Sequence, residues 1–194
     1  APSEEAANQI IAPIEEQLKQ IGGLDCYGSD EDTIASVVGE LLNVTQTTLS
    51  VAESCTGGGL GQMLTSVSGS SRYFWGGVIS YDNSAKITLL GIDPETLAQH
   101  GAVSEVVAQQ MAVGVRSRLN TWGISITGIA GPEGGTETKP VGLVYIGLAG
   151  PGEQVMSFCH QFGARGREWV RQVSACSALD HLRRRLLTEP LISD

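Results

Sequence analysis

The chain has 194 residues, of which 41% are hydrophobic and 17% charged, and it contains 25 glycines. Its length suits one domain, or one domain with a small appendage, and its composition suits a globular α/β protein better than a disordered or coiled-coil chain. The net charge of −9 disfavours nucleic acid and anionic lipid as partners, because an acidic surface repels phosphate groups.

The sequence shows no segment typical of a membrane or secreted protein. No apolar run approaches the roughly 20 residues that cross a bilayer, and no basic region followed by an apolar block opens the chain. We therefore expect a cytoplasmic protein. Its four cysteines form no C-x-x-C motif and have no histidine at metal spacing, so we expect neither a disulfide nor a metal. Because the chain begins with Ala1-Pro2, we expect a processed product or a piece of a longer protein.

The first 44 residues differ in their pattern of apolar residues from those that follow. Apolar residues recur at helical spacing over 10–21 and again over 34–42, and Pro13 marks a helix start or a kink. This part carries little obvious chemistry, so we interpret 1–44 as a helical linker segment and 45–194 as the functional domain.

From Thr45 onward, strands alternate with helices. Segments with the length, β-branching and glycine punctuation of strands are 48–53, 76–82, 123–131, 143–150 and 154–162. A helix beginning near Ser104 is indicated by the four-residue steps of Val103, Val107, Met111, Val115 and Leu119. Another begins near Gly166, with Trp169, Val173, Cys176, Leu179, Leu182 and Leu186 facing inward. We expect a single α/β domain, layered α/β/α around a mixed sheet, with no strand order predicted.

A polar, glycine-rich turn, "AESCTGGGLG", lies at 52–61 between a predicted strand and a predicted helix. The N–H groups at a helix N-terminus can hold an anion or a developing oxyanion, and glycines let a ligand approach the backbone. The turn matches neither the P-loop nor the G-x-S-x-G elbow. It is therefore either a ligand site or a point of close packing between strand and helix.

Lysine is scarce: Lys19, Lys86 and Lys139 are the lysines of the chain. Lys86 follows "ISYDNSA", where a desolvated lysine can lose its proton and activate a serine hydroxyl. The alternative is a solvated lysine in the first turn of a helix. Polar groups nearby, at Tyr81 and Ser71, are either part of a site or merely turn and cap residues.

The segment 123–142, "GISITGIAGPEGGTETKPVG", runs from a predicted strand into a long loop. Long loops on a rigid scaffold commonly carry function. Thr127 and the backbone amides after it could bind a phosphate or a carboxylate, and the alternative is a structural crossover.

Taken together, these motifs resemble a known family. "AESCTGG", "GSSRYFWGGVISYDNSAK", "GAVSE", "SITGIAGPEGGTETKPVG" and "GREWVR" occur in the order and spacing of the C-terminal domain of CinA, the competence/damage-inducible protein family that includes the PncC nicotinamide mononucleotide amidohydrolases. The resemblance covers roughly 45–187. The first 44 residues are similar to the segment that joins this domain to the preceding domains of CinA.

The resemblance implies hydrolysis of the carboxamide of nicotinamide mononucleotide to nicotinate mononucleotide and ammonia, with no cofactor or metal. The positions that match the family's site are Ser54, Lys86, Tyr81, Ser71, Thr127 and Arg167. Many relatives read "GDR" where this chain has "RGR", so Arg165 is an alternative to Arg167. Relatives form dimers or larger assemblies, so we expect a homo-oligomer.

The resulting hypothesis is a Ser-Lys amidohydrolase. Neutral Lys86 takes the proton of Ser54, and Ser54 attacks the carboxamide carbon. Tyr81 orients or polarises this pair. The oxyanion lies against amides of the turn at Cys55, Thr56 and Gly57, and the substrate phosphate binds Thr127, Gly128 and Arg167.

Three alternatives stay open. Cys55 is a rival nucleophile, because a helix N-terminus lowers the pKa of a thiol. The same loops could instead form a nucleotide-binding regulatory domain without catalysis. A structural oligomerisation domain would require the glycine loops to be buried at an interface and empty of ligand.

Overall fold

The computed structural model describes residues 3–116, 121–151 and 154–188, which fall into two units divided between Thr33 and Ile34. The smaller unit contains helix α1 (Glu4–Gly22) and a short 3-10 turn at Gly23–Asp25. Pro13 lies inside α1, so it does not mark the start of that helix. The large apolar residues of α1 are exposed, with Ile21 at 83%.

The larger unit is built on a mixed sheet, as expected. Its strands in the described residues are β1 (Thr48–Glu53), β2 (Phe74–Ile79), β3 (Thr121–Gly128), β4 (Leu143–Ala149) and β5 (Val155–Gln161). They lie in the order β2-β1-β3-β4-β5. Strand β1 is parallel to both of its neighbours, β2 and β3. Strand β4 is antiparallel to both of its neighbours, β3 and β5. Each of the strand predictions is confirmed, with ends shifted by a few residues.

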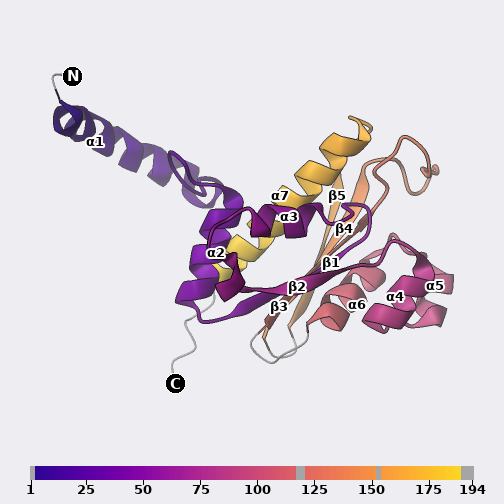
Figure 1. The fold of residues 1–194 in the computed structure, drawn as a ribbon. Coiled ribbons are helices and arrows are strands. Elements are labelled where there is room, and N and C mark those ends of the chain that lie inside the picture. The colour runs from indigo at the N-terminus through magenta and orange to yellow at the C-terminus, as the bar shows by residue number, and fades with distance from the viewer. Residues whose placement is uncertain (1–2, 117–120, 152–153, 189–194) are drawn as a thin grey trace. The chain divides into compact units, whose positions relative to one another are not determined.

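Helices cover both faces of this sheet (Figure 1). They are α2 (Ile34–Val44), α3 (Gly59–Thr65), α4 (Asn83–Leu90), α5 (Pro94–His100), α6 (Glu105–Val115) and α7 (Arg167–Thr188). The helices α2, α3 and α7 pack on one face over the larger apolar core, and α4, α5 and α6 pack on the other over a smaller one. The α/β/α layering is therefore confirmed. None of the described helices is both long and apolar enough to span a bilayer.

Two details of the helix predictions change. Val103 precedes α6, whose N-cap is Ser104, and the predicted position Leu119 lies outside the described residues. The prediction that Trp169 faces inward is wrong, because its side chain is 37% exposed. It lies in the first turn of α7, where it packs edge-on against Phe162 and not in the core.

The parallel strands place their carboxyl ends at one edge of the sheet. Strands β1, β2 and β3 end at Glu53, Ile79 and Gly128, and the chain continues from each into a polar loop. In open α/β sheets, ligands bind in the crevice at this edge, where neighbouring connections leave toward opposite faces. Here α3 follows β1 on one face and α4 follows β2 on the other.

Candidate active site

Ser54 is the first residue after β1, and its position is held from two sides. Its N–H donates to the carbonyl of Ile126 on β3, 3.0 Å away. The preceding Glu53 is buried at 2% exposure. Its carboxylate accepts N–H groups at the start of α3, at 2.8 to 3.1 Å, from Gly58, Leu60 and Gly61. A negative charge at a helix N-terminus is favourable, so Glu53 fixes the turn that carries Ser54.

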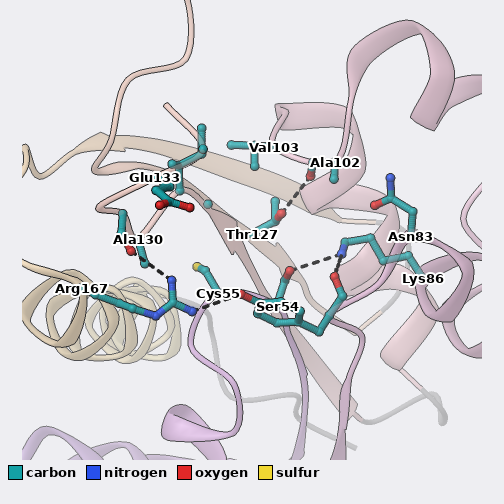
Figure 2. A pocket seen from close by; sticks show the side chains of 15 residues that line it. Ser54, Cys55, Asn83, Lys86, Ala102, Val103, Thr127, Ala130, Glu133 and Arg167 are labelled. Atoms are coloured by element: carbon teal, nitrogen blue, oxygen red, sulfur yellow. Dashed lines mark hydrogen bonds between the residues drawn. The ribbon is translucent and has the colours of Figure 1, made fainter. Parts of the chain in front are cut away.

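Lys86 reaches this turn from α4 and is almost completely buried, at 1% exposure. Its Nζ lies 3.2 Å from Ser54 Oγ (Figure 2). It also lies 2.8 Å from the carbonyl oxygen of Ser80 and 3.2 Å from that of Tyr81. Burial lowers the pKa of Lys86 below its usual value, because an ammonium loses its hydration there. This excludes the solvated lysine considered above.

The partners of Lys86 define how a neutral amine sits in the site. Its two N–H groups donate to the carbonyls of Ser80 and Tyr81. The tetrahedral nitrogen then directs its lone pair toward the remaining partner, Ser54 Oγ, which can donate its proton. The arrangement suits a general base acting on a serine hydroxyl.

A cavity of about 250 Å³ opens in front of these two side chains. It is lined by Ser54, Cys55, Tyr81, Asn83, Lys86, Ala102, Val103, the segment 127–131, Glu133, Gly134 and Arg167. The lining comes from the ends of all three parallel strands, from α4 and from the start of α7. A cavity with a few converging polar groups is the usual form of a small-molecule site.

Of the two candidate arginines, Arg167 faces the cavity. Its guanidinium donates to the carbonyl of Gly131 and to the hydroxyl of Tyr81, each at 3.1 Å. Arg165 instead lies over the ring of Trp169, with 5.2 Å from Cζ to the ring centroid. Tyr81 therefore contacts Lys86 through its carbonyl, while its hydroxyl belongs to the Arg167 end of the cavity.

Thr127 lies at the end of β3 with its hydroxyl donating to the carbonyl of Ala102, 2.8 Å away. A hydroxyl has one proton, so this oxygen offers a ligand in the cavity an acceptor and no donor. Such a group suits an N–H or O–H of a substrate better than a phosphate. The next residue, Gly128, lines the cavity, and a Cβ there would lie 2.7 Å from Val144.

Three residues expected at the site do not line the cavity. Ser71 lies exposed in the 3-10 turn Ser70–Arg72 that precedes β2. Thr56 is fully buried behind the turn, and Gly57 is exposed with a positive φ of 58°. Within the described residues, the N–H groups of Cys55 and Thr56 donate to no other residue. Amides next to a nucleophile are typical donors to an oxyanion.

Cys55 does not have the pKa that a nucleophile requires. Burial raises the pKa of its thiol to about 11, and the charge of Glu53 acts in the same direction. The expectation that the helix N-terminus would lower this pKa is wrong, because loss of hydration outweighs the helix. At neutral pH the side chain is a thiol, which is a poor nucleophile.

The sequence reasoning missed several groups of the site. Asn83 and Glu133 line the cavity, and the carbonyl of Ser80 orients Lys86. Asn83 follows the N-cap of α4, and Glu133 lies in the long loop after β3. Their place in the cavity could not be predicted without the strand order, which brings these two segments to the same end of the sheet. Within the described chain, no three or more His, Cys, Asp or Glu side chains gather as a metal site.

The family model of the CinA C-terminal domain matches residues 31–186. The chain belongs to the CinA C-terminal domain family. It is 70% identical to a CinA-like protein of Nostoc punctiforme over 190 residues, which is 97% of this chain and 46% of that protein. It is 68% identical to a CinA-like protein of a Cyanothece species, with 97% and 45% covered. The chain thus spans about half the length of the curated relatives it matches.

Solved structures of CinA proteins share the fold. A competence/damage-inducible protein from Agrobacterium tumefaciens matches with a TM-score of 0.74 and 35% identity, covering 83% of this chain and 100% of that one. The competence damage-inducible protein A from Klebsiella pneumoniae matches with a TM-score of 0.77 and 31% identity, covering 81% and 97%. The mixed sheet and its helical layers are therefore those of the CinA family.

Proposed function

We propose that the chain is an amidohydrolase that converts nicotinamide mononucleotide and water to nicotinate mononucleotide and ammonia. The observation that carries this proposal is the 3.2 Å approach of Lys86 Nζ to Ser54 Oγ in a buried setting. Burial lowers the pKa of Lys86, which favours the neutral amine that a general base requires. The choice of substrate rests on the resemblance of the site motifs to the PncC amidohydrolases.

In the proposed reaction, Lys86 takes the hydroxyl proton of Ser54 as Oγ attacks the carboxamide carbon. The N–H group of Cys55, which lines the cavity, binds the oxyanion that forms, with the N–H of Thr56 beside it in the same turn. Protonated Lys86 then gives its proton to the amide nitrogen, the C–N bond breaks and ammonia leaves. Water attacks the resulting ester with Lys86 again as base, which releases the carboxylate product and restores Ser54.

Binding of the substrate uses the other end of the cavity. The guanidinium of Arg167 is suited to the phosphate, because a planar fork of N–H donors matches two phosphate oxygens. The Tyr81 hydroxyl, which accepts from Arg167, keeps that fork directed across the cavity. Thr127 offers its oxygen to a donor of the substrate, such as the carboxamide NH₂ or a ribose hydroxyl.

The test separates catalysis from binding. Calorimetry with nicotinamide mononucleotide measures binding, while chromatography and an ammonia assay on the same sample measure turnover. The proposal predicts equal amounts of nicotinate mononucleotide and ammonia. Binding without product would contradict it and favour a regulatory nucleotide-binding domain.

We further propose that the protein is cytoplasmic and works as a homo-oligomer, a dimer or larger. The edge strand β2 exposes Trp75 at 52% and Ile79 at 56%, which suits contact with a second copy. Sedimentation of the purified chain tests this. A monomer at micromolar concentration would contradict it.

A further inference from the structure

Arg171 contacts the turn behind Ser54 on the side away from the cavity of the proposed reaction. It lies on α7, one turn after Arg167, and its guanidinium donates twice to the carbonyl of Thr56. The distances are 3.2 Å from Nε and 2.7 Å from Nη2. The positive charge of the guanidinium therefore lies next to a backbone carbonyl oxygen in the turn that carries the nucleophile.

That carbonyl begins a chain of hydrogen-bonded peptide groups. The peptide group that contains the Thr56 carbonyl also contains the N–H of Gly57. This N–H donates to the carbonyl of Ser54, 3.1 Å away. The peptide group of the Ser54 carbonyl in turn contains the N–H of Cys55, one of the proposed oxyanion donors. In a trans peptide the C=O and N–H point in opposite directions, so each group passes polarisation to the next.

We propose that Arg171 is a positioning residue of the oxyanion hole, acting through the Thr56 and Ser54 carbonyls on the N–H of Cys55. Its charge polarises both peptide groups, which makes that N–H a stronger donor, and its two hydrogen bonds fix the direction in which the N–H points. This role rests on the proposed amidase reaction, because an oxyanion forms only there.

The effect belongs to the transition state. The oxygen of a bound carboxamide carries little charge, whereas the oxygen of the tetrahedral intermediate carries a full negative charge. A stronger N–H donor therefore stabilises the intermediate more than the bound substrate, which raises kcat and leaves KM nearly unchanged. Removal of a whole oxyanion donor costs roughly 100- to 1,000-fold in kcat, so weakening one costs less, about tenfold.

The turn has a separate support that keeps it folded without Arg171. Glu53 holds the N–H groups of Gly58, Leu60 and Gly61 from the other side. Loss of Arg171 therefore removes the charge on the Thr56 carbonyl while the start of α3 stays anchored. This makes a catalytic effect separable from unfolding.

A cavity of about 340 Å³ between α3 and α7 gives access to the same guanidinium. It is lined by Thr56, Gly59, Gln62, Met63, Glu168, Arg171, Gln172 and Ala175. When Arg171 is truncated, a guanidinium ion from solution can enter here and donate to the vacated Thr56 carbonyl. The site thus allows chemical rescue, which a general packing role would not show.

The experiment compares the full chain with Arg171→Ala, Arg171→Lys and the control Gln172→Ala, a neighbour in the same cavity wall. Initial rates of ammonia release from nicotinamide mononucleotide give kcat and KM, and thermal melting checks folding. Arg171→Ala is expected to lose about tenfold in kcat, with KM within twofold, and millimolar guanidinium restores much of the loss. Arg171→Lys keeps the positive charge but lacks the two parallel N–H donors, so its kcat should lie between those of wild type and Arg171→Ala. Gln172→Ala should have the kcat of wild type.

The outcomes separate this role from the proposed function. Wild-type protein without turnover overturns both. Wild-type turnover that Arg171→Ala leaves unchanged, or a loss that guanidinium does not restore in a folded variant, overturns the role of Arg171 alone. If Arg171→Ala does not fold, Arg171→Lys decides: unchanged kcat in that variant overturns the role.

Discussion

Replacing Lys86 with methionine tests the base most cleanly, because the two side chains have a similar unbranched shape. The variant keeps the packing of a residue that is 1% exposed and removes the amine. Loss of a general base costs about 100- to 10,000-fold in rate. Ammonia release from nicotinamide mononucleotide should fall by that factor, because no other amine lies against Ser54 Oγ in the described residues.

The same substitution has offsetting effects on stability. The carbonyls of Ser80 and Tyr81 lose their donor, at about 1 to 3 kcal/mol each. Against this, the folded state no longer holds a desolvated amine, which costs several kcal/mol, so we expect a free energy of unfolding within about 2 kcal/mol of wild type. Urea denaturation measures it. Lys19→Met, at an exposed lysine of the smaller unit, is the matched control. A folded Lys86→Met that retains turnover within about tenfold would refute the assignment of the base.

Further predictions concern charges around the site and the core. Glu53→Gln should destabilise the chain by about 2 to 4 kcal/mol in urea denaturation, because its three charge-assisted bonds weaken; an unchanged midpoint would be inconsistent with the anchoring role. Asp82→Asn keeps the α4 cap but removes a charge that raises the pKa of Lys86, so the acid limb of the kcat/KM profile should move to lower pH; a move to higher pH would contradict this. Burial, then the charge of His160, lowers the pKa of His181 from 6.5 to about 4. The folded state thus binds fewer protons, and wild type should lose stability, on the order of 2 kcal/mol, as the pH falls from 6.5 to 4. His181→Gln should lose less over that range, and an equal loss in both proteins would exclude the effect.

Much of the fold follows from residue patterns. Strands such as 48–53 were predictable because β-branched residues lie between polar turns, and α7 because its apolar residues recur at helical spacing. The exposure of Trp169 was not predictable, because the spacing of apolar residues does not show that the first turn of α7 extends beyond the core. Strand order was not predictable either, since it depends on long-range pairing.

The central pair of side chains in the site was predictable from the sequence, whereas its backbone groups were not. Ser54 and Lys86 were singled out by a polar turn and by a scarce residue type, and their approach follows from the common edge of the parallel strands. The carbonyls that orient Lys86 left no mark in the sequence, because every residue has one. The same holds for the Thr56 carbonyl that receives Arg171, whose side chain lies 115 residues away along the chain.

The sequence also could not show which of several competing effects determines the properties of a residue. A turn before a helix suggested a reactive Cys55, yet burial determines its pKa. The hydroxyl of Thr127 suggested a phosphate donor, but its proton is given to Ala102 from another segment. Both the burial of Cys55 and the partner of Thr127 depend on segments that only the fold brings next to these residues.

The rate of ammonia release from nicotinamide mononucleotide by Ser54→Ala, set beside wild type at the same pH, tests the central claim most directly. We predict steady release by the wild-type chain and a loss of several orders of magnitude in a variant that melts like wild type. Equal rates in the two proteins would show that the hydroxyl at position 54 is not the nucleophile.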